Sequence, residues 1–225
     1  MNRFCTLLIT ATLFLTMQNC LSANAVTHKE SLQQAQNSVD KSSIHVSASK
    51  FYPAYHIAPP ANFMGNPAGF VYFNNQYHLF YAHNPYSAKQ ENMHLGHYVS
   101  SDMIHWCEMP VALAPSETYD KDGIVSGSAI VDEDMLYLLY TGNIVNKTQE
   151  KTERHQTQNL AMSKDGINFA KSANNSVIKM APHYSYLEFS SHNFKDPFVW
   201  KQSDRYYALV GTQYEKTKED RKSVV

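Results

Sequence analysis

Two polar residues stand directly before a proline at the start of a strand-like segment, and both could take part in chemistry. Asn66 precedes Pro67 and an aromatic-rich run, and Asp196 precedes Pro197 and a second such run. A carboxylate such as that of Asp196 can attack a carbon centre or accept hydrogen bonds, whereas the amide of Asn66 has no anionic oxygen with which to attack. Asn and Asp are also common in simple Asx turns. The two residues alone leave a shared site and a pair of ordinary turns equally open.

The segments that follow these residues have the composition of β-hairpins. Each is an apolar strand, a short polar turn and a second strand rich in Tyr and Leu, the residues that favour strands. Three such hairpins span Gly69 to Tyr81, Ser128 to Tyr140 and Pro197 to Val210. Their turns are Asn74-Asn75, Asp132-Glu133-Asp134 and Gln202-Ser203-Asp204. The Asn pair can adopt the left-handed conformations that a tight hairpin turn requires.

A second repeated signature follows the first two hairpins. The pattern Ser-x-Asp-x-Ile-x-aromatic runs from Ser100 to Trp106 and again from Ser163 to Phe169. A repeat of about 60 residues with roughly four short strands predicts an all-β chain built of β-propeller blades, with a β-sandwich as the alternative. Blades begin near a central axis. We therefore predict that Asn66, Asp196 and the turn around Ser126 converge there.

The N-terminal residues have the features of a targeting segment. A short positive start, an apolar run from Cys5 to Met17 and a small-residue cleavage site predict a signal peptide over residues 1–25 and a secreted protein. A retained anchor helix is the alternative, although the run is shorter than the roughly 20 residues that a membrane span needs. Residues 26–50 are rich in Ser, Gln, Asn and Lys, which predicts a mobile leader before a domain over residues 51–225.

Secretion also bears on the cysteines and on glycosylation. Removal of the signal peptide leaves Cys107 as the one cysteine of the mature chain, so no intrachain disulfide is expected. Two sequons make Asn146 and Asn174 candidate glycosylation sites. The formal net charge is −1, with Lys and Arg scattered, so we expect no nucleic-acid or membrane partner. No cofactor and no metal site are expected, because the histidines lack acidic or cysteine companions in a ligand pattern.

In combination, these motifs resemble glycoside hydrolase family 32, the invertases and other β-fructofuranosidases. The resemblance runs from about His56 to Gly211. The matching blocks, as they stand here, are Phe63-Met64-Gly65-Asn66-Pro67-Ala68-Gly69, Tyr77-His78-Leu79-Phe80-Tyr81, Asn84-Pro85, Gly96-His97, Ser101-Asp102, His105-Trp106, Ser126-Gly127-Ser128-Ala129, Tyr140-Thr141-Gly142 and Lys195-Asp196-Pro197. The resemblance implies a five-bladed propeller with a central site for sucrose or another β-fructoside. It also implies substrate contacts from Phe63, Ser126 and Lys195.

The departures from the family pattern concern catalysis. Family members are retaining glycosidases, in which a carboxylate nucleophile and a carboxylic acid stand about 5 Å apart. The nucleophile position falls on Asn66, and Asp196 matches the residue that stabilises the transition state. The acid/base Glu block that follows in the family is absent from these 225 residues. Ala82 replaces a sugar-binding Gln, Leu95 replaces a Trp, and Lys195 replaces an Arg. We therefore expect no β-fructosidase activity, even after Asn66→Asp.

The length of the chain sets a further expectation. Five blades of about 60 residues need about 300 residues, so residues 51–225 hold fewer than three blades. Such an array exposes blade edges, which favours self-association. Three functions stay open on the sequence: an inactive protein of a sucrose-hydrolysing family, a module that binds fructosides or glycans without cleaving them, and a remnant with no selected ligand.

Overall fold

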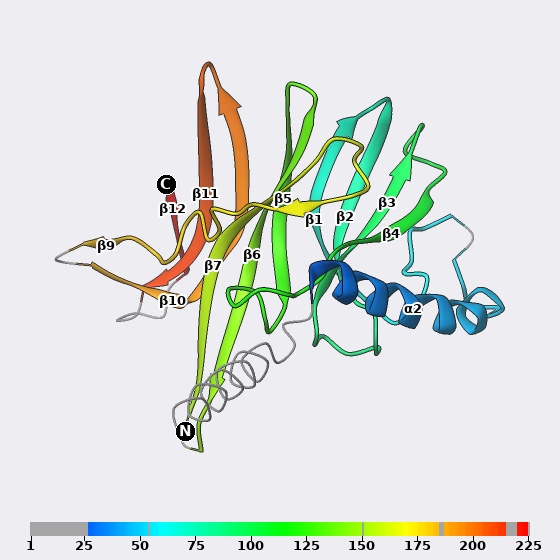
Figure 1. Ribbon diagram of the computed structural model, residues 1–225, viewed down its shortest axis with the longest axis horizontal. Helices are drawn as coiled ribbons and strands as arrows, with labels where there is room; N and C mark the ends of the chain where they lie inside the picture. Colours follow the sequence, from blue (N-terminus) through cyan, green and yellow to red (C-terminus); the bar gives the residue numbers. More distant parts are fainter. Residues whose placement is uncertain (1–26, 54, 150, 185–186, 215–219, 225) are drawn as a thin grey trace, which may run out of the picture.

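The computed structural model describes residues 27–53, 55–149, 151–184, 187–214 and 220–224. Within this part of the chain one helix precedes three antiparallel sheets (Figure 1). The helix is α2 (His28–Ser47). The first sheet has the order β1 (Phe63–Phe73), β2 (Gln76–Asn84), β3 (His94–Ser100), β4 (Cys107–Leu113). The second has the order β5 (Ile124–Asp132), β6 (Met135–Lys147), β7 (Thr152–Ser163), β8 (Ala170–Lys171). The third has the order β12 (Asp220–Val224), β11 (Arg205–Tyr214), β10 (Leu187–Gln202), β9 (His183–Tyr184).

The three sheets are arranged as successive propeller blades. Strand β5 packs against both β1 and β10, so the first long strand of each sheet lies beside the equivalent strand of the next (Figure 1). In the third sheet β12 pairs with β11, and short β9 pairs with the start of β10 at the opposite edge, so the described residues contain no fourth strand beyond β12. The prediction of an all-β chain forming fewer than three complete blades of a propeller is confirmed, and the sandwich alternative is not observed.

The predicted hairpin turns form where the sequence places them. Asn74 and Asn75 have φ angles of 48° and 62°, and the strands on either side pair up to Phe73 and Gln76. Two consecutive left-handed residues give the twist that a two-residue hairpin needs. Glu133 and Ser203 have φ angles of 53° and 57° in the corresponding turns of the second and third blades.

The repeated Ser-x-Asp signature forms the same turn in both complete blades. The Asp102 Oδ1 atom accepts hydrogen bonds from the backbone N–H groups two and three residues later, at 2.8 and 2.7 Å. Asp165 Oδ1 accepts from the equivalent two groups, both at 2.8 Å. Ser100 Oγ and Ser163 Oγ each accept from the backbone N–H three residues later. The sequence repeat is therefore a structural repeat, set by local hydrogen bonds of Asp and Ser side chains.

The expectation of a mobile leader over residues 26–50 is wrong for its central part, which folds as α2. Thr27 and Glu30 form a capping box at the helix start, with Glu30 N–H donating to Thr27 Oγ1 at 3.3 Å. The helix buries Ala35 and Val39 against Val111 of β4. This narrow apolar stripe, one residue per turn, does not raise the overall hydrophobicity of the segment. The polar composition therefore concealed an amphipathic helix.

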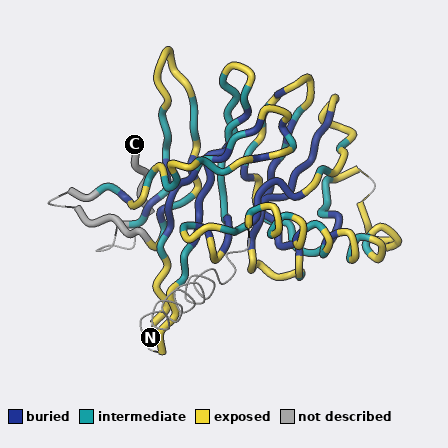
Figure 2. The backbone as a smooth tube through the Cα atoms, viewed as in Figure 1, coloured by how far each residue is buried: buried dark blue, intermediate teal, exposed yellow. Residues whose placement is uncertain are grey.

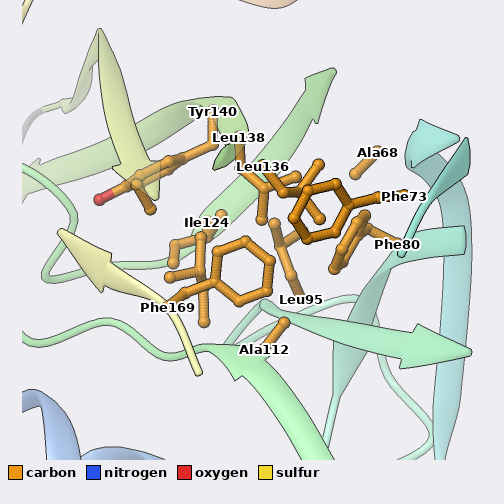
Figure 3. Packing of buried hydrophobic residues seen from close by; sticks show 12 residues of the cluster. Ala68, Phe73, Phe80, Leu95, Ala112, Ile124, Leu136, Leu138, Tyr140 and Phe169 are labelled. Atoms are coloured by element: carbon orange, nitrogen blue, oxygen red, sulfur yellow. The ribbon is translucent and has the colours of Figure 1, made fainter. Parts of the chain in front are cut away.

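The main core lies between the first and second blades (Figure 3). It contains large apolar side chains from both sheets, including Phe80, Leu95, Ile124, Leu138 and Phe169, each at most 6% exposed. Figure 2 shows the buried backbone concentrated in the middle of these two blades. A smaller cluster of Ala181, Phe194 and Val210 packs at the third blade.

A buried ion pair beside this core joins β8 of the second blade to the segment between β4 and β5. Lys171 Nζ lies 2.5 Å from Asp120 Oδ2, and the two side chains are 6% and 0% exposed. Tyr140 donates its hydroxyl to the same carboxylate at 3.1 Å. Burial lowers the pKa of Lys171, and the charge of Asp120 opposes that change. The pair is structural, because both charges are satisfied within the protein.

Two stacked histidines are buried in the first blade. His78 Nε2 lies 3.2 Å from the Phe73 carbonyl oxygen, which can only accept, so Nε2 carries the proton and Nδ1 is an acceptor. His97 Nε2 then donates to His78 Nδ1 at 3.0 Å. Burial lowers the pKa of His97 to about 3, with a further lowering from His78. Both rings act as neutral packing groups.

Candidate functional site

Each of the three inner strands has an irregularity near a residue that the sequence predicts to be functional. The pairing register shifts between Met64 and Pro67 on β1, on either side of Asn66. It shifts between Ile124 and Ser126 on β5, and beyond Lys195 on β10, next to Asp196. Such bulges re-aim side chains and are frequent at functional sites. The three turns are therefore equivalent positions of neighbouring blades.

Close approach of β1 and β5 depends on small residues. A Cβ atom on Gly127 would lie 3.0 Å from the Ala68 carbonyl oxygen, and one on Gly69 would lie 3.0 Å from the Ala129 Cβ atom. Larger side chains at these glycines would force the strands apart. The Ser-Gly-Ser-Ala block thus brings Ser126 next to the strand that carries Asn66.

Ser126 and Asp196 are joined directly. The backbone N–H of Asp196 donates to Ser126 Oγ at 3.0 Å, and Asp196 has a φ angle of 59°. A non-glycine residue in this left-handed region needs support from its surroundings. Two residues farther along β5 and three farther along β10, Val199 N–H donates to Ser128 Oγ at 3.0 Å. Two serines of β5 therefore fix the position of β10.

Ser126 is held by a buried chain of hydrogen bonds through Thr141 and Gln158, called the relay below. Ser126 Oγ donates to Thr141 Oγ1 at 3.1 Å, and Thr141 Oγ1 donates to Gln158 Oε1 at 2.8 Å. Gln158 Nε2 then donates to the Phe194 carbonyl oxygen at 2.7 Å, two residues before Asp196. Thr141 and Gln158 are both 0% exposed. The relay begins and ends on β10, so it fixes the backbone on which Asp196 sits.

The Asp196 carboxylate itself faces solvent. Its side chain is 62% exposed, and Lys195 Nζ lies 3.8 Å away with a side chain that is 45% exposed. An exposed pair at this distance contributes little to stability. In the described residues the carboxylate receives no hydrogen bond, so its oxygens can accept from sugar hydroxyls.

Asn66 and Phe63 lie on the first inner strand. Asn66 is exposed, and no described residue bonds its amide. Phe63 is half-buried, and its ring lies 3.1 Å from the position that a Cβ atom on Gly65 would take, beside Ala82. Among the predicted site residues the structure joins Ser126 to Asp196 by a hydrogen bond, sets Lys195 beside them, and places Asn66 and Phe63 on neighbouring β1.

Other residues singled out in the sequence lie away from this site. Leu95 is 0% exposed in the main core, so it offers no stacking surface for a sugar. Asn146, at the end of β6, and Asn174 are exposed. Cys107 is a free, exposed thiol. The predicted signal peptide lies outside the described residues.

No described helix is long and apolar enough to cross a membrane. No group of three or more His, Cys, Asp or Glu side chains within the described ranges is placed to hold a metal ion.

The successive antiparallel blades and the turns at their inner strands define a β-propeller domain. Residues 56–222 match the family model of the glycosyl hydrolases family 32 N-terminal domain, and the chain belongs to this family. Among curated proteins, the chain is 41% identical over 184 residues to a sucrose-6-phosphate hydrolase of Escherichia coli and 39% identical over 186 residues to a raffinose invertase of the same species. These matches cover 81% and 82% of this chain but 36% and 37% of the relatives. The chain thus spans about a third of the length of the curated relatives it matches.

Three solved structures are also similar to this chain. The chain superposes on the GH32 β-fructofuranosidase BmSUC1 of Bombyx mori with a TM-score of 0.75 and 33% identity, over 88% of this chain and 39% of that chain. A sucrose complex of a BmSUC1 variant with an aspartate replaced by alanine matches with a TM-score of 0.73 and 34% identity, over 85% and 38%. A sucrose-6-phosphate hydrolase of Lactobacillus gasseri matches with a TM-score of 0.72 and 26% identity.

Proposed function

We propose that this chain binds a β-fructoside such as sucrose at the inner ends of its blades and does not hydrolyse it. The amide at Asn66 carries the proposal. A retaining glycosidase must form a bond between a carboxylate oxygen and the anomeric carbon. An amide oxygen lacks the negative charge for that attack, so the fructosyl-enzyme is not formed.

Binding does not need the nucleophile. The Asp196 carboxylate is exposed, and its backbone is fixed by the relay through Ser126, Thr141 and Gln158. A fixed carboxylate can accept two hydrogen bonds from neighbouring hydroxyls of a sugar ring. The solved BmSUC1 variant, in which an aspartate is replaced by alanine, holds sucrose. That complex supports a sugar site in this family that persists after a carboxylate is lost.

We also propose that the protein is secreted and glycosylated. The positive, apolar and small-residue segments at the N-terminus support secretion. Exposure of Asn146 and Asn174 supports modification of both sequons, because the transferase needs an accessible asparagine. Intact mass of protein secreted from eukaryotic cells, before and after enzymatic deglycosylation, tests both. An unshifted mass would contradict glycosylation.

The experiment for the main proposal measures binding and hydrolysis on the same preparation. We expect calorimetry to show saturable binding of sucrose. We also expect no release of glucose over a long incubation. Asp196→Ala should weaken binding, and Asp204→Ala, in the exposed turn between β10 and β11, is the matched control. Turnover of sucrose by the unmodified chain would overturn the assignment of Asn66. Absence of any binding would favour a remnant with no ligand.

A further inference from the structure

A polar pocket of about 210 Å³ opens between α2 and the loops that flank the strand ends of the first two blades. Helix α2 lies across the ends of the first-blade strands (Figure 1), and it supplies one side of the pocket. Its walls include Ser31 and Gln34 of α2, Tyr86 after β2, His94 at the start of β3, and Lys121 and Asp122 before β5. Asn66, Ser126 and Asp196 do not line it.

The walls of the pocket are held in place by hydrogen bonds between separate parts of the chain. Ser38 Oγ of α2 donates to the Pro85 carbonyl oxygen at 2.8 Å, and Val111 N–H of β4 donates to Gln36 Oε1 at 3.0 Å. Both bonds come from the helical turn that follows Gln34, and they fix this part of α2 against the first blade. The backbone on the helix side of the pocket is therefore held by the fold.

His94 supplies a preformed acceptor. Its side chain is almost fully buried, with 4% of the residue exposed, and Nδ1 lies 2.6 Å from the Asn92 carbonyl oxygen. Because a carbonyl oxygen can only accept, Nδ1 carries the proton and Nε2 keeps its lone pair. Burial lowers the pKa of His94 to about 4, so the ring is neutral at pH 7. No described residue hydrogen-bonds Nε2, which leaves it available to a ligand hydroxyl.

The charges in the pocket cancel. Lys121 Nζ pairs with Asp122 Oδ2 at 2.5 Å, and the same oxygen accepts from Val145 N–H at 2.7 Å. A site without net charge does not favour an anion or a cation. The pocket is also lined by Tyr86, which is 44% exposed and whose ring packs edge-on against His94 at a centroid distance of 5.5 Å. Its free face is a platform for the apolar face of a small ring.

We propose that this pocket binds a neutral sugar unit, independently of the axial site. The pocket offers hydroxyl and amide groups that both donate and accept, an imidazole acceptor and a half-exposed tyrosine ring, without net charge. These features match the chemistry of a polyhydroxylated ring. The volume of about 210 Å³ lies below the ~300–1,000 Å³ of pockets that enclose drug-sized ligands, which limits the occupant to about one ring. The neutral sugar can be a free monosaccharide or the end of a longer saccharide.

Nuclear magnetic resonance of ¹⁵N-labelled protein tests this proposal with fructose, glucose and sucrose as probes. The backbone amide of Gly123 and the side-chain amide of Gln34 should shift saturably with at least one probe. Ser31→Leu and Gln34→Leu place an apolar group in the pocket and should weaken that binding at least tenfold. Lys41→Leu, an exposed change two helical turns beyond Gln34, should leave it within twofold.

A variant of the axial site separates this proposal from the proposed function. Asp196→Ala should leave the shifts at Gly123 within twofold, whether or not the axial site binds fructosides. The proposal is overturned if no probe produces saturable shifts at Gly123. It is also overturned if Ser31→Leu and Gln34→Leu bind as the parent does, or if Asp196→Ala abolishes the shifts.

Discussion

Removing the hydroxyl of Thr141 should disturb the relay that fixes Asp196 while keeping the shape of the core. Thr141→Val is nearly isosteric, and Thr141 is 0% exposed. Ser126 Oγ would lose its acceptor and Gln158 Oε1 its donor. Ser126 is only half-buried and can turn its hydroxyl to water. Gln158 is 0% exposed and cannot.

The expected loss of stability follows from that difference. Leaving one buried polar group unsatisfied costs about 1–3 kcal/mol, and Gln158 is the group that stays unsatisfied. We expect the free energy of unfolding to fall by about 2 kcal/mol, measured by urea denaturation with tryptophan fluorescence. Sucrose affinity should fall by about 3–10-fold, because the Asp196 backbone loses its fixed support. That range corresponds to at most about 1.4 kcal/mol.

Two further variants make the result specific. Thr141→Ser keeps the hydroxyl and should retain sucrose affinity within twofold. Thr118→Val removes an exposed hydroxyl and should change the unfolding free energy by less than about 0.5 kcal/mol. The reasoning is refuted if Thr141→Val matches the parent in both measurements, or if Thr141→Ser loses as much affinity as Thr141→Val.

Three other predictions follow from buried or substituted groups. Lys171→Met should lower the free energy of unfolding, measured by urea denaturation, by about 3–5 kcal/mol because it leaves Asp120 charged and buried. Lys151→Met breaks an exposed pair and should lower it by less than about 1 kcal/mol. Equal losses in the two variants would contradict this prediction. Burial lowers the pKa of His97 to about 3, below the unfolded value of about 6.5, so the unfolded chain takes up the proton first as the pH drops. The free energy of unfolding should therefore fall below about pH 6.5, by about 2 kcal/mol at pH 5. His97→Phe should flatten the measured dependence of the unfolding free energy on pH. Asn66→Asp should form a covalent adduct with an activated fructoside whose leaving group needs no proton, detected by intact mass, while the unmodified chain forms none.

Local chemistry explains which parts of the fold were predictable. The Asn74-Asn75 turn and the Ser-x-Asp turns depend on side chains that bond to backbone groups a few residues away, so the sequence pattern determines them directly. Helix α2 was missed because its apolar stripe is one small residue per turn, Ala35 and Val39, within a polar segment. Its capping box, Thr27 with Glu30, was a readable signal.

The approach of Ser126 to Asp196 was predictable from the sequence, but the hydrogen bonds that support it were not. Equivalent turns of a repeat indicated Asn66, Ser126 and Asp196, and the hydrogen bond from Asp196 to Ser126 brings two of them together. Thr141 and Gln158 were not identified as site residues, because their roles depend on the pairing of β6 with β7 and on contact with β10. Thr141 stood in a recognised family block, yet its partner lies 17 residues away.

Two measurements on the unmodified chain with sucrose test most directly whether Asn66 makes this a protein that binds without hydrolysis. Calorimetry measures binding, and intact-mass analysis after incubation detects any fructosyl adduct. We predict saturable binding, no release of glucose and no protein species heavier by one fructosyl unit. Release of glucose together with a fructosyl adduct would contradict the proposal, because an amide at position 66 could not have formed that bond.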